Sequence, residues 1–195
     1  METVGKYSKQ RGWMVIQRRK NGEVNFDRGW NDYLHGFGFP SKEYWVGLYN
    51  LDALLHQKRI GTVENNLALR IDLTDWDGAH AYTECNSFYI NPENDDFRIT
   101  SIGTCTGTPQ IRSPMAYIVG KTFSTFDYHS NTIRSPECLR LQRGGWWFGS
   151  CRHSNLNGVY AAKEERMTVD KIYVKHWKKV NSNNTSLRYV TMKLQ

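Results

Sequence analysis

The chain has 195 residues, of which 39% are hydrophobic and 13% aromatic, and a formal net charge of +7 at neutral pH. This length suits one domain with a substantial core, and the composition excludes a disordered tail. No run approaches the roughly 18 apolar residues of a membrane span, so membrane insertion is not expected. The positive charge permits acidic partners such as anionic glycans, although solubility alone would also account for it.

The first third of the chain predicts short strands and two short helices. Residues 13–19 form a strand that ends in a basic turn. A helix begins at Asp27 or Gly29, a second short strand covers 44–48, and Asn50 is a fair N-cap for a second helix. The side chains expected to face the core from the two helices are Trp30, Tyr33, Leu34, Phe37, Leu51, Leu54 and Leu55.

The clearest strand follows at 67–74, where leucine and isoleucine alternate with polar or small residues. This alternation predicts one buried and one exposed face. A turn at 75–78 leads into a long strand at 79–90, which a second turn at 92–96 folds back onto 97–102.

The hairpin brings Cys85 and Cys105 together, because their midpoint, residue 95, falls in its turn. The alternation of side chains along regular strands argues against the pairing, because it places the two cysteines on different faces. Cys85 lies three residues from Phe88, on the opposite face, whereas Cys105 lies eight residues from Phe97, on the same face. A β-bulge, with Gly103 as the candidate position, would reconcile the two, so we predict this disulfide together with a bulge.

Regular patterning disappears between residues 107 and 160, and long irregular segments in compact domains are usually functional. Within this stretch Cys138 and Cys151 bracket a loop that contains Gly-Gly-Trp-Trp at 144–147. A disulfide across so short a loop would stabilise it by roughly 3 kcal/mol, and we predict that it forms. Two further strands are expected at 173–177 and 189–194, the last of them returning to the central sheet.

Several blocks of this sequence, in order, resemble the fibrinogen-related domain, the family of ficolins, tachylectins, angiopoietins and the fibrinogen chains. The blocks are Gly-Trp-Met-Val-Ile-Gln-Arg-Arg at 12–19, Gly-Trp-Asn-Asp-Tyr-Leu-His-Gly-Phe-Gly at 29–38, Glu-Tyr-Trp-Val-Gly-Leu at 43–48, Leu-Arg-Ile-Asp-Leu at 69–73, Phe-Ser-Thr-Phe-Asp at 123–127, Gly-Gly-Trp-Trp-Phe at 144–148 and Ser-Asn-Leu-Asn-Gly-Val-Tyr at 154–160. The resemblance implies an α+β fold with a twisted antiparallel sheet, two short helices and a loop-rich C-terminal binding subdomain.

The resemblance also implies a domain organisation. Residues 1–195 correspond to one fibrinogen-related domain that lacks most of its N-terminal subdomain. The sheet core covers about 12–106, the loop-rich binding subdomain about 107–188, and the returning strand 189–195. No secretory signal is visible in the chain. Since relatives are extracellular and disulfide-bonded, we expect a fragment of a secreted protein, with a cytoplasmic relative as the alternative.

Members of the family commonly bind calcium in the loop after Phe-Ser-Thr-x-Asp. The corresponding side-chain ligands fall on His129 and Asn131, with Asp127 and Glu137 as the nearby carboxylates. Calcium prefers charged oxygen ligands, and an imidazole is a poor substitute. Calcium binding is therefore expected to be weakened, and the alternative role for Asp127 is to cap the backbone of its own loop.

Ficolin-like members recognise acetylated sugars in a pocket beside the second cysteine of the loop. In this chain Arg152 stands at the position of the family's imidazole, His153 follows it, and Gln142 stands where an aromatic wall is common. The resemblance implies a cis peptide bond between Ser150 and Cys151. The implied ligand-binding residues are Gln142, Ser150, Cys151, Arg152, His153 and Tyr160, and the neighbouring residues expected to serve as scaffold are Trp146, Trp147, Asn155, Asn157 and Gly158.

These observations predict a non-enzymatic extracellular recognition domain, and they leave two hypotheses for its partner. The first is a lectin-like, innate-immune function with a glycan ligand, and the second is an angiopoietin-like signalling ligand that binds a protein receptor. Either function would gain avidity from homo-oligomerisation through an upstream segment. Overlapping sequons at Asn183 and Asn184 predict N-glycosylation in a secreted protein. No catalytic motif is present, and the basic residues near the end carry no nucleic-acid-reading motif.

Overall fold

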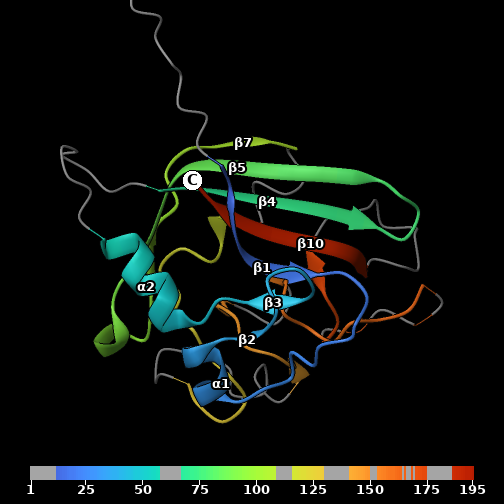
Figure 1. Ribbon diagram of the computed structural model, residues 1–195, viewed down its shortest axis with the longest axis horizontal. Coiled ribbons are helices and arrows are strands. Elements are labelled where there is room, and N and C mark those ends of the chain that lie inside the picture. Colours follow the sequence, from blue (N-terminus) through green and yellow to red (C-terminus); the bar gives the residue numbers. More distant parts are fainter. Residues whose placement is uncertain are drawn as a thin grey trace, which may run out of the picture.

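The computed structural model describes residues 12–57, 67–108, 116–129, 141–149, 153–163, 165, 168, 170–174 and 186–195. A twisted antiparallel sheet crosses the upper part of the molecule, with two helices and a loop-rich C-terminal half beneath it (Figure 1). The α+β fold expected from the sequence is confirmed. Among the described segments, no helix combines the length and apolar character needed to cross a bilayer.

Four long strands form the middle of the sheet, and short strands extend it on both sides. The sheet order is β2-β3-β1-β10-β4-β5-β6, and β7 also pairs with β5. The long strands are β1 (Met14–Arg19), β10 (Leu187–Leu194), β4 (Leu67–Asp75) and β5 (His80–Ile90). The short strands are β2 (Phe37–Gly38), β3 (Tyr44–Trp45), β6 (Ile99–Ser101) and β7 (Cys105–Gly107). The C-terminal strand β10 therefore lies between β1 and β4, in the centre of the sheet, as expected.

The alternation of β4 places its leucines and Ile71 in the core, where Leu69, Ile71 and Leu73 lie opposite buried apolar residues of β10. The other face of β4 is less exposed than its polar sequence indicated. Asp72 keeps only 7% of its surface accessible. Its carboxylate contacts the Arg70 guanidinium at 2.9 Å and the Lys193 ammonium at 2.8 Å. These neighbours cover the carboxylate while they compensate its charge.

The two helices are α1 (Trp30–His35) and α2 (Leu48–His56), and a single 3-10 turn, η1 (Glu93–Asp95), follows β5. The start expected for α2 was wrong, because its N-cap is Gly47 and its apolar face begins with the buried Leu48. Asn50 lies inside the helix, and its side chain donates to the Val46 carbonyl at 2.8 Å. The residues that both helices bury are Tyr33, Leu34, Leu48, Leu51 and Leu55, whereas Leu54 is half-buried and Phe37 lies in β2.

Cys85 and Cys105 lie opposite each other in the β5–β7 ladder and form a disulfide. The expected bulge exists, but it is not at Gly103. The pairs Cys85–Cys105 and Tyr89–Ser101 share one register, so no residue is inserted between them at Gly103. One irregularity lies between β5 and β4, where Leu67 and Leu69 pair with Phe88 and Cys85, and a second lies between β5 and β6, where Tyr89 and Ile90 pair with Ser101 and Ile99. In the first, two residues of β5, 86 and 87, lie opposite one residue of β4, which brings both Cys85 and Phe88 into the core despite their odd spacing.

Two fully buried tryptophans fix the C-terminal half beneath the sheet. The Trp147 indole N–H donates to the Phe97 carbonyl at 2.8 Å, and that of Trp146 donates to the Ser154 hydroxyl at 3.3 Å. Gly144 precedes them with a φ of +87°, and a Cβ there would collide with the Asn157 carbonyl. Gly144 is therefore required by a close backbone approach, and Gly145 by the adjacent rings of Phe123 and Tyr33. The scaffold role expected for the tryptophans agrees with their burial.

A small second sheet and a chain of amide contacts complete this half. Strand β8 (Ser154–Asn155) pairs antiparallel with β9 (Tyr173–Val174), the described part of the strand expected at 173–177. The Asn157 side chain donates to the Gly145 carbonyl at 2.9 Å and accepts from the Gln17 amide at 3.1 Å. Because Gln17 belongs to β1, this contact connects the loops to the sheet.

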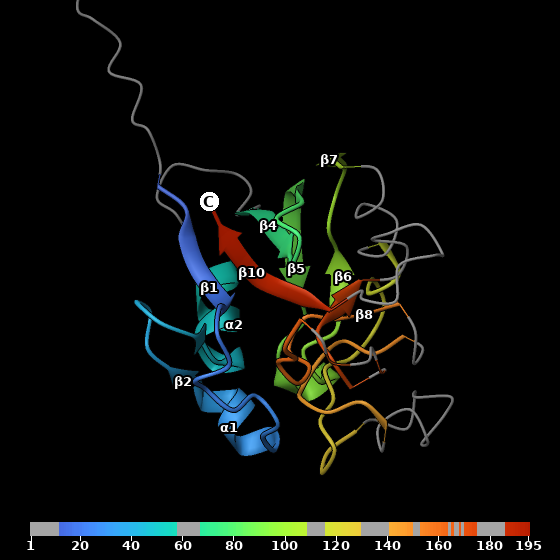
Figure 2. The same ribbon diagram turned by 90° about the vertical axis from the view of Figure 1, so that its right-hand side faces the viewer.

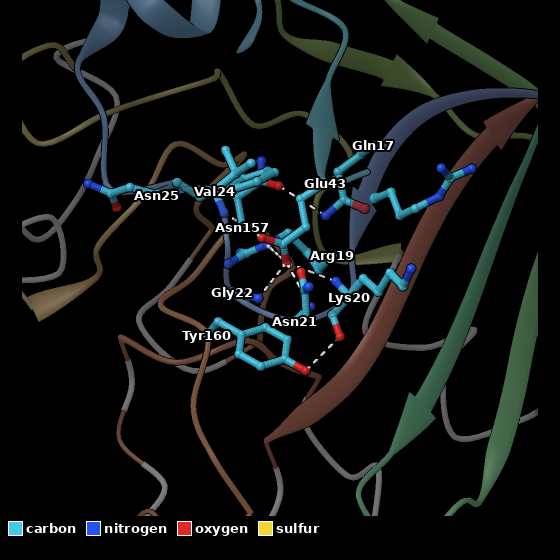
Figure 3. Close-up of polar contacts among 12 residues, drawn as sticks. Gln17, Arg19, Lys20, Asn21, Gly22, Val24, Asn25, Glu43, Asn157 and Tyr160 are labelled. Atoms are coloured by element: carbon cyan, nitrogen blue, oxygen red, sulfur yellow. Dashed lines mark hydrogen bonds and ion pairs between the residues drawn. The ribbon is translucent and has the colours of Figure 1, made fainter. Parts of the chain in front are cut away.

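A buried ion pair makes a second connection (Figure 3). Arg19, 1% exposed, lies with its Nε 3.6 Å from the Glu43 carboxylate, and it donates through Nη1 to the Gly158 carbonyl. Glu43 is itself fully buried and accepts backbone N–H groups from the turn after β1, at Lys20 (2.8 Å), Asn21 (3.2 Å), Gly22 (3.0 Å) and Val24 (2.8 Å). This carboxylate determines the path of the turn.

The two charges respond differently to burial. Burial lowers the pKa of Arg19 to about 10, the attraction of Glu43 opposing the change, so the guanidinium stays charged at neutral pH. Burial alone would raise the pKa of Glu43, but the N–H groups of Lys20 and Val24 and the charge of Arg19 outweigh it, and the net pKa is lowered. Both groups are therefore ionised in the folded protein at neutral pH.

Replacing Glu43 with alanine should destabilise the domain by about 3–5 kcal/mol, because it leaves a buried guanidinium and several turn N–H groups without their acceptor. Glu84→Ala is the matched control: its carboxylate pairs with Arg70 at 3.1 Å but is 39% exposed, and its loss should cost less than about 1 kcal/mol. Chemical unfolding at pH 7 measures both. Since the folded pKa of Glu43 is depressed, its contribution is complete at neutral pH and declines only as pH falls below the ordinary value of 4.5. Equal losses in the two variants would contradict this assignment.

Candidate ligand-binding site

Half of the residues expected to bind ligand fall outside the described residues. These are Ser150, Cys151 and Arg152, together with the second cysteine of the loop, Cys138. The Cys138–Cys151 disulfide and the cis bond before Cys151 thus remain predictions, as does glycosylation at Asn183 and Asn184. The structure does place Gln142, His153 and Tyr160.

Gln142 is a structural residue rather than an accessible pocket wall. Its side chain is 1% exposed, and its amide donates to the Tyr173 hydroxyl at 3.2 Å. Tyr173 lies in β9, opposite Asn155 of β8. The expectation that Gln142 contacts a ligand is corrected on this point, because packing against the small sheet removes it from the surface.

His153 forms one half of a stacked pair with Tyr117. The two ring centroids are 4.1 Å apart and the rings are 11° from parallel. Tyr117 is 52% exposed, so the pair presents a flat aromatic surface to solvent. Tyr117 could not be predicted from the sequence, because it lies in the unpatterned stretch after residue 107 and no local pattern relates it to His153.

Tyr160 lies in a different place, at a groove of about 620 Å³. Its hydroxyl donates to the Lys20 carbonyl at 2.8 Å, and its ring meets that of Trp76 edge to face at 6.0 Å. The other residues lining the groove are Arg19, Asn21, Gly22, Glu23, Val24, Asn25, Phe26, Val159, Ala162 and Glu165. Of the described residues that the sequence assigns to the pocket beside Cys151, Tyr160 lines this groove, whereas Gln142 and His153 do not.

Asp127, the carboxylate of the loop expected to bind calcium, caps helix α1. Its oxygens accept the backbone N–H of Trp30 at 2.9 and 3.2 Å, and Oδ1 also accepts the Thr125 hydroxyl at 2.6 Å. A negative charge at a helix N-terminus is favourable, because the first N–H groups have no partner inside the helix. Gly29 leaves room for this contact, since a Cβ there would lie 2.5 Å from an Asp127 oxygen.

Tyr128 adds a second contact between this loop and helix α1. The Tyr128 ring stacks on Trp30 with centroids 4.0 Å apart, and its hydroxyl donates to Asp96 at 2.8 Å. His129 is exposed, and Asn131 and Glu137 lie outside the described residues. Over the described ranges, no three His, Cys, Asp or Glu side chains gather as a metal site would require. The donors that are described, a carboxylate already engaged with a helix and an imidazole, do not fit a calcium site.

Comparison with known proteins identifies the family. Residues 4–195 match the sequence profile of the C-terminal globular domain of the fibrinogen beta and gamma chains. The chain belongs to this family. Human angiopoietin-4 is 36% identical over 184 residues, which cover 94% of this chain and 34% of that protein. Human angiopoietin-2 is 37% identical over 184 residues, which cover 94% of this chain and 35% of that protein.

Solved structures of the family share the fold described above. The fibrinogen-like globe domain of human ANGPTL2 superposes with a TM-score of 0.80 at 34% identity, covering 98% of this chain and 83% of that one. Lamprey fibrin D-dimer in complex with the peptide Gly-His-Arg-Pro-amide superposes with a TM-score of 0.76 at 31% identity. The match covers 94% of this chain and 61% of that one. The fibrinogen-like domain spans about a third of the length of the angiopoietins it matches. Membership of a family of non-enzymatic ligand-binding domains agrees with the expectation that it is not an enzyme.

The role of Asp127 can be separated from calcium binding by two substitutions. Asp127→Ala should lower stability by roughly 0.5–2 kcal/mol because α1 loses its capping acceptor, whereas Asp127→Asn should lose much less, since an amide oxygen still accepts the Trp30 N–H. Thermal unfolding with calcium and with a chelator should give the same midpoint for the unsubstituted domain. A calcium-dependent rise of the midpoint, lost in Asp127→Asn, would instead identify a metal site.

Proposed function

We propose that this domain is the receptor-binding part of a secreted signalling protein of the angiopoietin type, and that it binds a protein through its loop-rich C-terminal half. The observation that carries the proposal is the similarity to angiopoietins over 94% of the chain. The lectin-like hypothesis, first in order from the sequence, gains no support from these relatives. The second hypothesis is therefore preferred.

Four described residues of the loop-rich half expose large hydrophobic side chains, as residues of protein interfaces do. Tyr117 is 52% exposed, Phe126 57%, Tyr128 40% and Leu141 56%. Exposed aromatic side chains are enriched at protein–protein interfaces and supply many of the residues that dominate binding. The segments that carry them, 116–129 in yellow and 141–149 in orange, lie together below the sheet (Figure 2). A receptor could contact them without disturbing the core.

Extracellular location is part of the same proposal. The domain contains the Cys85–Cys105 disulfide. Disulfides persist in oxidising compartments and are rare in reducing ones. The sequons at Asn183 and Asn184 would be used on a secretory route. Assembly into oligomers through an upstream segment would raise the avidity of a single weak contact.

The test compares two sets of aromatic substitutions. The double variant Tyr117→Ser/Phe126→Ser should weaken receptor binding at least about tenfold, because it removes two exposed aromatic contacts. Tyr82→Ser is the matched control, since Tyr82 is 37% exposed but belongs to β5 of the sheet. Binding is measured against a panel of displayed receptor ectodomains, with thermal unfolding to verify the fold of each variant.

If the double variant binds a receptor as well as the Tyr82→Ser control does, the loop-rich half is not the interface. Absence of any protein partner, together with glycan-array binding that Arg152→Ala abolishes, would restore the lectin-like hypothesis.

A further inference from the structure

Two exposed tyrosines and two carboxylates form a patch beside the helices. Tyr49 lies in α2 and is 40% exposed, and its hydroxyl donates to the Glu93 carboxylate of η1 at 2.9 Å. Tyr128 is also 40% exposed, and its hydroxyl donates to Asp96, directly after η1, at 2.8 Å. Figure 1 shows α2 and, in light green, the turn η1 on the same side of the molecule. Each tyrosine therefore has an acidic partner at the surface.

A row of ring contacts joins the two tyrosines. The buried Phe97 ring has its centroid 6.2 Å from that of Tyr49 and 6.1 Å from that of Trp30. Trp30 stacks on Tyr128 at 4.0 Å. The Phe97 carbonyl accepts the Trp147 indole N–H at 2.8 Å, which fixes the middle of the row to the core. The patch is therefore preformed, and a partner does not have to assemble it.

The patch is acidic, although the whole chain carries a net charge of +7. Asp95 is compensated by Arg98, whose guanidinium donates to its two oxygens at 2.8 and 2.9 Å and to the Gly120 carbonyl at 3.0 Å. Among the residues that the structure describes, neither Glu93 nor Asp96 forms an ion pair, and both accept tyrosine hydroxyl groups. The donors of Arg98 are thus already used, and the negative charge around η1 exceeds the positive charge.

The carboxylates also keep the tyrosines neutral. The hydrogen bond to Glu93 raises the pKa of Tyr49. The hydrogen bond to Asp96 raises the pKa of Tyr128, and the charge of Glu93 adds a smaller effect in the same direction. Because Glu93 influences both tyrosines, the two halves of the patch act on one another. Protonated phenol rings retain the negative faces that attract a cation.

Among the charged side chains of a protein partner, arginine matches this combination best. A guanidinium is planar, so it can stack on an aromatic ring while its edge donates to carboxylates. Hydrogen bonds between a guanidinium and a carboxylate are about twice as strong as bonds between neutral groups. A carboxylate or phosphate of a partner would instead be repelled by Glu93 and Asp96.

We propose that the patch formed by Tyr49, Glu93, Asp96 and Tyr128 binds an arginine side chain that a protein partner presents. Tyr128 also belongs to the exposed aromatic residues of the proposed receptor surface, so the patch extends that surface towards α2. The inference rests on the proposed function and names the chemistry of the receptor at this place. It shares no residue with the sequence-derived pocket beside Cys151.

A peptide titration tests the patch without a receptor. The probe is a blocked pentapeptide, Gly-Arg-Gly-Arg-Gly, and its control replaces arginine with citrulline, which keeps the shape of the side chain but is neutral. The arginine peptide should bind at least about tenfold more tightly, because citrulline loses the charge-assisted hydrogen bonds. Two-dimensional NMR measures both affinities from the ring resonances of Tyr49 and Tyr128, which are assigned from Tyr49→Phe and Tyr128→Phe. Equal affinity of the two peptides, or shifts confined to other residues, would overturn the proposal.

Two double variants separate a specific site from general attraction. Glu93→Gln/Asp96→Asn should weaken binding of the arginine peptide at least about tenfold, and both amides can still accept the tyrosine hydroxyls. Glu23→Gln/Glu84→Gln is the matched control, since it changes the net charge equally at carboxylates that are 55% and 39% exposed elsewhere. The control should change the affinity less than about twofold. An equal effect of both variants would show that only the net charge matters, which would overturn the proposal.

The same variants in the receptor assay distinguish failure of the inference from failure of the proposed function. A receptor that loses affinity with Tyr117→Ser/Phe126→Ser but not with Glu93→Gln/Asp96→Asn would support the proposed function and overturn the arginine site. A receptor that both variants weaken supports both proposals. If no receptor ectodomain binds the unsubstituted domain, the proposed function fails, and the peptide titration still decides whether the patch binds arginine.

Discussion

Glu43 is a carboxylate removed from water, and the neighbouring structure depends on how its charge is compensated. Its oxygens hold the turn after β1 through backbone N–H groups, and its partner Arg19 reaches the Gly158 carbonyl in the C-terminal half. A single buried ion pair therefore connects β1, the segment before β3 and the loops that follow the tryptophans. A buried charge without such partners would cost several kcal/mol, so the arrangement of these three segments is strongly specified.

The loop-rich half is ordered by contacts to the sheet rather than by secondary structure of its own. Trp147 donates to the Phe97 carbonyl beside β6, and Asn157 connects Gly145 to Gln17 of β1. Each of these polar groups is buried and would be costly without a partner. The loops can therefore present exposed aromatic residues on one side while their backbone is fixed on the other, which is the property that a recognition surface requires.

Asp127 and Tyr128 connect the loop that they begin to helix α1. The Asp127 carboxylate caps the helix, and the Tyr128 ring stacks on Trp30. A hydrogen-bonded cap and a ring contact therefore hold the start of this loop against the helix.

The sequence by itself determined the family, the α+β class, the alternation of β4 and the pairing of Cys85 with Cys105, because these depend on residues close in the chain or on an ordered series of motifs. Only the tertiary structure decided the burial of Gln142, the bulge in β5 at residues 86 and 87, and the cap that Asp127 gives to a helix 97 residues away. The groove belongs to the same class, since its turn, Trp76 and Tyr160 meet only when β1, β4 and the C-terminal loops are packed together. Such contacts join residues with no local pattern in common, so the physical reason for each appears only once the chain is folded.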